Sequence, residues 1–169
     1  MTDMQELPNR IVIERVTEPT EEVRLLIGEL EAVLSAEYPP EQRHGLPLDV
    51  IFRPHIRFFV ARSGGEPAGC GGVALFDTLA EVKRMYVREA MRGRGIAPAL
   101  LARIEHAARE AGHTTLRLET GDKQHAAMAF YRRSGFLVCD PFGEYRWKPP
   151  HTIATSVFME KPLTPVRQR

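Results

Sequence analysis

The chain has 169 residues, of which 43% are hydrophobic and 27% charged, as expected for one globular domain with a full core. Its 23 basic and 22 acidic residues leave a formal net charge of +1, which does not favour nucleic acid or an anionic membrane as a partner. The two cysteines, Cys70 and Cys139, have no second pair and no nearby histidines at metal spacing. We therefore expect free thiols and no metal site.

The compartment and the domain boundaries follow from the same simple features. No apolar run approaches the length of a membrane span, and the first residues lack the charged-then-apolar order of a signal peptide. We expect a cytoplasmic protein with one domain over residues 1–169, a core of about residues 9–161 and a loose tail over 162–169.

The first half of the chain predicts a strand, a helix and then an antiparallel meander of strands. The expected strands cover residues 10–16, 56–62, about 68–75 and from 81 onward, and the helix runs from Pro19 to the Pro39-Pro40 pair. The turn Ser63-Gly64-Gly65-Glu66 joins the second and third strands. Three glycines in the third strand, at positions 69, 71 and 72, indicate a bulge or a close approach by another backbone.

Residues 38–54 form a long connection rich in Pro, Gly and charged residues, with at most a short helical turn near 46–50. Connections of this kind often border a binding site. Tyr38, Arg43 and His44 are therefore candidate substrate contacts. The alternative for each is a solvated loop residue.

The stretch 81–110 reads as a strand, a turn with two glycines and an amphipathic helix that ends at Gly112. Such a turn presents unpaired N–H groups at the positive end of the helix dipole, which suits a phosphate or pyrophosphate. It lacks the Lys-Ser/Thr pair of a Walker loop, and the third glycine of a dinucleotide fingerprint would fall on Pro98. A purely structural turn is the alternative.

The second half predicts a fifth strand at 114–120, which a crossover helix makes parallel to the fourth. A gap at the C-terminal ends of two diverging parallel strands is a common ligand site. Asp122 is expected to cap a helix that ends at Ser134, and a sixth strand begins at Phe136. An aromatic and basic loop over 140–151 and a last strand over 152–160 follow. Together with the loop over 38–54, this loop is expected to border the substrate pocket.

Two motifs resemble one known superfamily. Arg92-Gly93-Arg94-Gly95-Ile96-Ala97 resembles the coenzyme A pyrophosphate loop of the GNAT acyl-CoA-dependent N-acyltransferases, whose pattern is (Gln/Arg)-x-x-Gly-x-(Gly/Ala). The run from Leu118 to Phe136 resembles the segment that carries their fifth strand and an aromatic-Tyr-x-x-x-Gly-Phe helix end. The resemblance implies the GNAT fold, a mixed α/β architecture whose mostly antiparallel sheet of about six to seven strands is flanked by about four helices and splayed between strands four and five.

The same resemblance assigns cofactor contacts by position. The fourth strand would bond pantetheine through its backbone, and the loop would hold the pyrophosphate. Where the family usually has an asparagine that contacts the cofactor arm, this chain has a glutamine, which keeps the amide on a longer stem. The implied contacts to acetyl-CoA are Met85, Tyr86, Val87, Arg92, Gly93, Arg94, Gly95, Ile96, Ala97 and Gln124.

Three residues are candidates for the chemistry. Tyr131 matches the tyrosine that protonates the departing CoA thiolate, with a core aromatic as the alternative. Glu119 is the best base candidate, because ribosomal-protein N-terminal acetyltransferases, which this segment resembles, place a glutamate 12 positions before the tyrosine, and 131 − 119 is 12. Glu81 is the other base candidate. Either glutamate could instead be an ion-pair partner of a neighbouring arginine, Arg84 or Arg117.

The implied activity is direct acetyl transfer from acetyl-CoA to a primary amine of a small molecule in a ternary complex. A covalent acyl-enzyme is disfavoured because neither cysteine lies beside a recognisable histidine partner. Transfer to a protein N-terminus or lysine is the enzymatic alternative, and a non-catalytic CoA-binding sensor or interaction module is the alternative from another class. Members of this superfamily are often dimers, so a homodimer is an open alternative.

Overall fold

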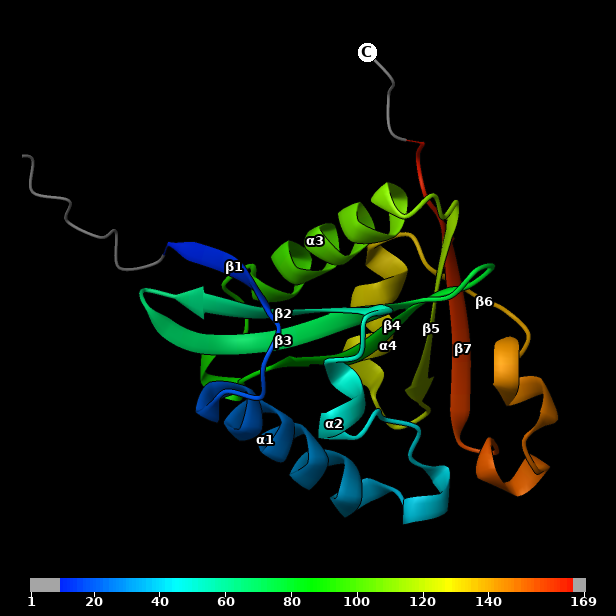
Figure 1. Ribbon diagram of the computed structural model, residues 1–169. Coiled ribbons are helices and arrows are strands. Elements are labelled where there is room, and N and C mark those ends of the chain that lie inside the picture. The colour runs from blue at the N-terminus through cyan, green and yellow to red at the C-terminus, as the bar shows by residue number, and fades with distance from the viewer. Residues whose placement is uncertain (1–9, 166–169) are drawn as a thin grey trace, which may run out of the picture.

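A computed structural model describes residues 10–165 and shows a seven-stranded sheet with helices on both faces (Figure 1). The strands are β1 (Ile11–Val16), β2 (Ile56–Ser63), β3 (Glu66–Leu75), β4 (Ala80–Val87), β5 (Thr115–Gly121), β6 (Leu137–Val138) and β7 (Ser156–Pro162). They are ordered β1-β2-β3-β4-β5-β7-β6, and all neighbours are antiparallel except β4 and β5. The expected mixed, mostly antiparallel sheet is therefore confirmed.

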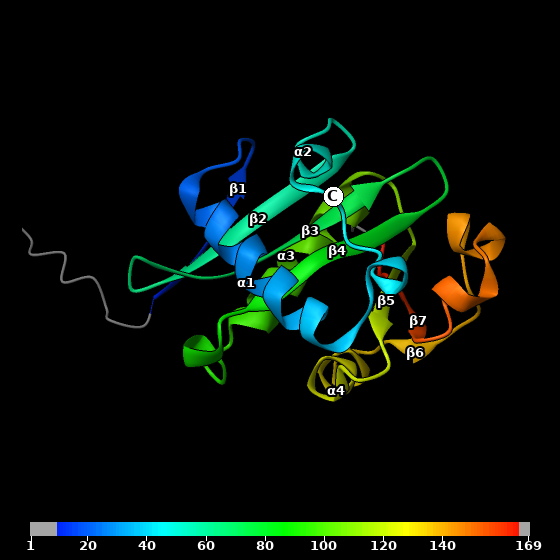
Figure 2. The ribbon, with the colours of Figure 1, turned by 90° about the horizontal axis from the view of Figure 1, so that it is seen from below.

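Helices cover both faces of the sheet, with α3 above it and α1 and α2 below it in Figure 1, and with α1 and α2 nearest the viewer in Figure 2. The α-helices are α1 (Glu21–Glu37), α2 (Leu48–Ile51), α3 (Ile96–Glu110) and α4 (His125–Arg133), and the short 3-10 helices are η1 (Pro40–Gln42), η2 (Glu89–Met91), η3 (Gly143–Trp147) and η4 (Pro150–Thr152). No helix in residues 10–165 is both long and apolar enough to span a membrane.

Two core clusters follow from the helix faces. Apolar side chains three to four residues apart on α3 are buried against the sheet, namely Leu100, Leu101, Ile104 and Ala108, and those of α1 are Val23, Leu26, Ile27 and Leu30. Full burial of one Leu or Ile side chain stabilises a fold by about 1.5–3 kcal/mol. Tyr131 of α4 belongs to the same buried cluster as α3, together with Val82 of β4 and Leu118 of β5.

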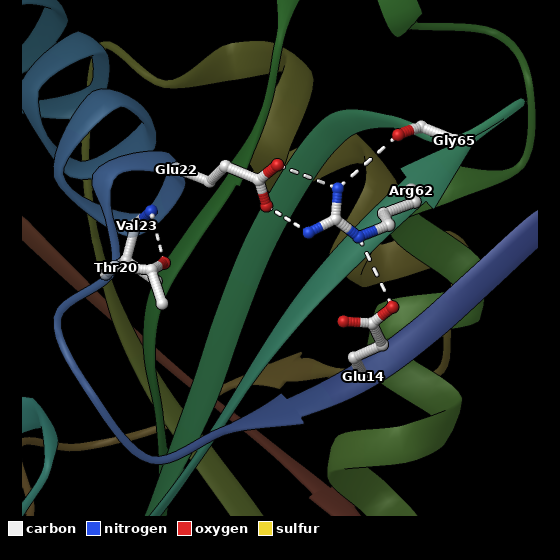
Figure 3. A network of polar contacts seen from close by, with 6 residues as sticks. All are labelled: Glu14, Thr20, Glu22, Val23, Arg62 and Gly65. Carbon is white, nitrogen blue, oxygen red and sulfur yellow. Dashed lines mark hydrogen bonds and ion pairs between the residues drawn. The ribbon is translucent and has the colours of Figure 1, made fainter.

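One arginine on β2 ties α1 to the edge of the sheet (Figure 3). The Arg62 guanidinium donates to both carboxylate oxygens of Glu22 on α1, and its Nε lies 3.3 Å from Glu14 on β1. The hydrogen bond to Glu22 raises the pKa of Arg62. Thr20 caps α1 by accepting the Val23 N–H at 3.3 Å. These contacts fix the start of the helix whose other end reaches the cleft.

The sheet opens where β4 and β5 meet. Only Glu81 and Arg117 pair across these two strands, and beyond this bridge the strands separate. On its other side β4 keeps a long antiparallel ladder with β3, so the opening lies inside the sheet and not at an edge. The expected splay between strands four and five is confirmed, and it leaves an opening between two neighbouring strands inside the sheet.

Two local expectations in the second half were wrong. Asp122 does not cap α4, because the N-cap is Gln124, two residues later, and it makes no side-chain cap bond. The Asp122 N–H instead donates to Thr155 O, which ties this turn to the start of the last strand. The tight β5–α4 turn therefore determines where the helix begins.

The end of the chain also differs from the expectation. The last strand begins at Ser156 because η4 and the turn over 153–155 precede it, and the strand continues to Pro162. Leu163 is buried and its N–H donates to Thr114 O, so the loose tail cannot begin at 162. The segment 166–169 and residue 9, named in the expected boundaries, lie outside the described residues.

Candidate active site

A cleft lies where β4 and β5 separate, and all three predicted catalytic side chains line it. Glu81 and Met85 come from β4, Glu119 from β5, and Gln124 and Tyr131 from α4 and its N-cap. The loop after α1 closes one side of the cleft with Tyr38 and His44. The three catalytic candidates, far apart in the sequence, therefore share one cleft.

The β4 wall of this cleft contains a bulge. The register between β3 and β4 shifts at Gly71, so that Arg84 and Met85 lie opposite this one residue. Arg84 adopts a φ of 56°, which is strained for a residue with a side chain. A Cβ at Gly71 would lie 2.7 Å from the Met85 sulfur, so a larger residue there would displace the Met85 side chain. The bulge takes the Met85 backbone out of the regular ladder beside the cleft.

Buried contacts hold the bulge in place. The Arg84 side chain is 5% exposed, its Nε donates to Leu46 O at 3.0 Å, and it forms an ion pair with Glu31 of α1. Burial lowers the pKa of Arg84. A Cβ at Gly45 would collide with the Arg84 guanidinium, so a larger residue there would displace this buried side chain.

Glu119 projects from β5 into the cleft. Its Oε2 accepts a hydrogen bond from Ser156 Oγ at 2.6 Å. Burial raises the pKa of Glu119, and the Ser156 bond and the nearby His44 and Lys83 offset part of this rise. A carboxylate with a raised pKa holds a proton more strongly than an exposed one, which suits a general base.

Glu81 lies in a closed polar triad. Lys83 Nζ is 2.8 Å from Glu81 Oε2, and Tyr145 OH donates to the same oxygen at 2.7 Å. Lys83 also donates to Tyr145 OH at 2.9 Å. Burial, with the Glu81 charge beside it, raises the pKa of Tyr145. This carboxylate is engaged by two partners, whereas Glu119 has one.

The expected ion pairs of these glutamates are different in the structure. Arg84 pairs with Glu31 and Arg117 pairs with Glu160, whose Oε2 lies 3.2 Å from the Arg117 Nε. Glu81 pairs with Lys83 instead. Glu81 therefore does form an ion pair, as the structural alternative expected, but its partner is Lys83 and not an arginine.

Tyr131 is 6% exposed, and it lines the cleft while its ring packs into the core. Phe130 and Phe136 flank the ring at centroid distances of 5.3 and 5.5 Å. Burial raises the pKa of Tyr131. The phenol therefore keeps its proton until a strong base forms beside it, and the rigid packing fixes its position at the cleft.

The glycine turn before α3 is open and basic. Gly93 and Gly95 have φ values of 78° and 84°, and the turn over 92–95 is exposed. The N-cap of α3 has no side-chain cap bond, so its first N–H groups face outward from the helix. A Cβ at Gly93 would meet no atom within 4 Å. The turn has the space and the donors to hold a pyrophosphate.

The remaining predicted cofactor contacts have structural partners. The Tyr86 hydroxyl donates to Glu29 at 2.9 Å, and burial raises the pKa of Tyr86 to about 12. Val87 O accepts from Arg92 Nε at 3.3 Å. Gln124 lines the cleft and its amide donates to Glu37 at 3.1 Å. The Tyr86 hydroxyl, the Val87 carbonyl and the Gln124 amide are therefore already engaged within the protein.

Sequence reasoning missed Lys83, Tyr145 and Ser156. Ser156 faces Glu119 because β7 pairs with β5, which no local pattern reveals. Lys83 follows Glu81 by two residues on the same strand face, and this spacing could have indicated the pair. Tyr38 was expected either as a substrate contact or as a solvated residue, but it is buried and its hydroxyl accepts the Lys123 N–H at 2.8 Å.

Other chemistries find little support in the described part of the chain. Residues 10–165 contain no group of three or more His, Cys, Asp or Glu side chains placed to bind a metal ion. Cys70 and Cys139 are free thiols, as expected, and burial raises the pKa of each. A thiol with a raised pKa is a poor nucleophile at neutral pH.

This fold and cleft define an acyltransferase, and the chain belongs to the acetyltransferase (GNAT) family, whose family model matches residues 25–136. It is 44% identical to the IAA acetyltransferase of Azospirillum brasilense over 93% of this chain and 100% of that protein. It is 37% identical to the uncharacterised N-acetyltransferase YsnE of Bacillus subtilis over 74% of this chain and 82% of that one.

Solved structures agree with this family. A protein of Klebsiella pneumoniae assigned as an acyl-CoA N-acyltransferase superposes with a TM-score of 0.71 at 35% identity, covering 91% of this chain and 98% of that one. The PaiA N-acetyltransferase of Thermoplasma acidophilum, solved with coenzyme A, has a TM-score of 0.66 at 18% identity, covering 90% and 99%. The second match shows the shared fold.

Proposed function

We propose that this enzyme moves the acetyl group of acetyl-CoA to a primary amine of a small molecule by direct transfer in a ternary complex. The observation that carries the proposal is that Glu119, Tyr131 and the bulge of β4 meet at one cleft, where the sheet opens. Relatives named as N-acetyltransferases support nitrogen as the acceptor atom, and a fold neighbour solved with coenzyme A supports the acyl donor.

The proposed donor site runs from the glycine turn to the cleft. The N–H groups of Ile96 and Ala97, with Arg92 and Arg94 beside them, would hold the pyrophosphate, whereas Pro98 has no N–H to give. The backbone of β4 from Met85 to Val87 would bond the pantetheine arm along the opening. When bound, acetyl-CoA supplies the acetyl group as a reactive thioester. A backbone N–H near Met85 would polarise its carbonyl.

We assign the base to Glu119. The Lys83 ammonium and the Tyr145 hydroxyl already engage the same oxygen of Glu81. Glu119 has a raised pKa and one neutral partner, so it gains a proton more readily. In this assignment Glu81 positions Lys83 and Tyr145 at the cleft and takes no proton from the amine.

Tyr131 completes the reaction. The amine nitrogen bonds to the carbonyl carbon as the carbon–sulfur bond breaks, and the amine proton goes to Glu119. The thiolate that leaves takes the phenolic proton of Tyr131, which its surroundings keep in place at neutral pH. No covalent acyl-enzyme is needed, because one cleft holds both proton-transfer groups.

Acceptor-dependent thiol release tests the proposal. The wild-type enzyme should release CoA thiol from acetyl-CoA only when a primary amine is added, and mass spectrometry should find the acetylated amine. Tyr131→Phe should lower kcat about 100-fold or more without changing acetyl-CoA affinity, because the ring packing is kept. An unchanged kcat would remove Tyr131 from the mechanism, and acetylation of peptide N-termini or lysines alone would contradict the small-molecule acceptor.

A further inference from the structure

A second cavity of about 570 Å³ opens beside the β4–β5 cleft. The two cavities share a wall, made of Arg43, His44, Gly45, Glu81, Lys83 and Tyr145. We call this second cavity the outer groove. A molecule that lies in it contacts residues that also line the cleft, which holds Glu119.

Exposed aromatic rings mark the mouth of the outer groove. Seven large hydrophobic side chains are exposed among the described residues, and the only two aromatic ones, Phe76 and Trp147, both line this groove. Phe76 lies just after β3 and Trp147 ends η3, so the fold brings together two rings from distant parts of the chain. Trp147 is 80% exposed. Exposed rings that share a concave site favour a ligand with a flat apolar group.

Cationic side chains surround the same groove. Arg43, Lys83, Arg146 and Lys148 line it, against two carboxylates, Glu81 and Glu144. Lys83 neutralises Glu81 within the triad, so the remaining charge of the lining is positive. This balance disfavours a polycationic ligand and favours one that carries an anionic group.

Arg43 supplies a specific donor for that anion. Its Nη1 lies 3.5 Å from a Glu31 oxygen, whereas its Nε is buried and has no hydrogen-bond acceptor among the described residues. A buried charged donor without an acceptor is costly, and a carboxylate is the strongest partner for a guanidinium N–H. Arg43 lines both the cleft and the outer groove. An anion bound here would therefore lie close to the reacting end of the site.

We propose that the outer groove binds the acetyl acceptor, and that this acceptor is an aromatic amino acid or a close analogue. Its carboxylate pairs with Arg43, its ring lies between Phe76 and Trp147, and its amine points into the cleft toward Glu119. This inference rests on the proposed function, because it names the amine that the same cleft acetylates.

The test compares matched amines with the purified full chain and acetyl-CoA. L-Phenylalanine, phenethylamine and L-alanine differ by one group at a time, since phenethylamine lacks the carboxylate and L-alanine lacks the ring. L-Phenylalanine should have a kcat/KM about 10-fold or more above each of the other two, because each lost contact weakens recognition by roughly that factor. L-Tryptophan and tryptamine provide a second matched pair.

Two variants locate the groups that recognise the acceptor. Arg43→Gln should raise KM for L-phenylalanine about 10-fold while leaving KM for phenethylamine unchanged. Trp147→Ala should lower kcat/KM for L-phenylalanine but not for L-alanine, and its exposed position keeps the fold intact. Arg24→Gln, on an exposed part of α1, is the matched control and should change neither ratio.

Acetyl-CoA binding separates the failure of this inference from failure of the proposed function. If acetyl-CoA binds but phenethylamine, a polyamine or a peptide is acetylated as well as or better than L-phenylalanine, or if no amine of the panel is acetylated, the acceptor inference is overturned. It is also overturned if Arg43→Gln shifts KM equally for both members of a pair. If acetyl-CoA does not bind the wild type, the proposed function itself falls.

Discussion

Two glutamates of the cleft differ in their partners, and this difference decides their roles. Among residues 10–165, Glu81 is paired with Lys83 and bonded by Tyr145, whereas Glu119 is bonded by the Ser156 hydroxyl alone. Burial raises the pKa of Glu119 above that of a glutamate in the unfolded chain. The protonated form is therefore favoured in the fold. Glu119 contributes stability that is full below the unfolded pKa and is lost as pH rises through the folded pKa.

Glu119→Gln should therefore separate activity from stability. Loss of the base should lower kcat/KM about 100-fold or more, and the rise of wild-type kcat/KM with pH through the raised pKa should disappear. The free energy of unfolding of the variant should exceed that of the wild type at alkaline pH, because a buried charge is removed while the amide oxygen still accepts from Ser156. Urea denaturation and initial rates across pH measure both effects.

The control for this variant is Glu18→Gln, at an exposed position before α1, which should change neither quantity. The free energies of unfolding of Glu119→Gln and the wild type should converge at acid pH, where the wild-type carboxyl is protonated and therefore uncharged. A variant that is less stable by the same amount at every pH would show that the Glu119 charge is not penalised in the fold.

At the residue scale, sequence reasoning found the residues that carry motifs and missed those that act through tertiary pairing. Tyr131 and Glu119 could be predicted from the sequence, because each lies at a fixed place in a recognisable segment. Ser156 and Tyr145 reach the cleft from β7 and η3, and the partner of a side chain across a sheet or a loop leaves no local signal. The roles of Glu119 and Tyr131 stay predictions until rates are measured.

At the element scale, the bulge of β4 depends on one strained residue held by a buried side chain. Among residues 10–165, Arg84 is the only non-glycine residue with a positive φ. Its guanidinium contacts Leu46 O and Glu31. A glycine at this position would adopt the same backbone conformation with less strain. The contacts of Arg84 therefore offset the strain of its own backbone.

Replacing Arg84 should expose that strain. Arg84→Gly and Arg84→Ala lose the same side-chain contacts, so their difference reports on the backbone alone. Arg84→Gly should be the more stable of the two by about 1 kcal/mol, because a left-handed φ is sterically unfavourable for alanine and not for glycine. Urea denaturation gives the two free energies of unfolding.

Arg57 of β2 provides the matched pair for this prediction, since it lies in a strand and its φ is not positive. There the order should reverse, with Arg57→Ala more stable than Arg57→Gly by about 0.5–1 kcal/mol. If Arg84→Ala also had a higher free energy of unfolding than Arg84→Gly, position 84 would not adopt the left-handed conformation, and the prediction would fail.

Elements were predictable wherever one periodicity dominated. The apolar stripes of α1 and α3 and the meander of β2 to β4 follow from residue spacing, and glycines 69, 71 and 72 correctly indicated a bulge or close approach. The start of α4 was not predictable, because the turn after β5 and not a cap residue sets it. The short helices η3 and η4 were not predicted, because an irregular, Pro-rich loop has no repeating pattern.

At the scale of the whole molecule, a layered fold leaves its sheet open in one place. Helices α1 and α3 cover opposite faces (Figure 1), and the ladders on both sides of the opening are long, so the cleft is held by rigid walls. The parallel crossover that forms this opening was predictable from the order of strands and helices. The outer groove was not, because it joins loops that are distant in the sequence. A homodimer stays a prediction.

Titration with acetyl-CoA in a calorimeter tests the central claim, that this opening binds an acyl-CoA donor with its pyrophosphate at the glycine turn. The wild type should bind with a Kd on the order of 1 μM, about −8 kcal/mol. Gly95→Glu should lose binding, whereas Gly112→Glu should keep it. Gly112→Glu is the matched control, because the two glycines have similar φ values of 84° and 87° at opposite ends of α3, so both variants add the same backbone strain and the same charge. Equal binding by the two variants, or none by the wild type, would contradict the claim.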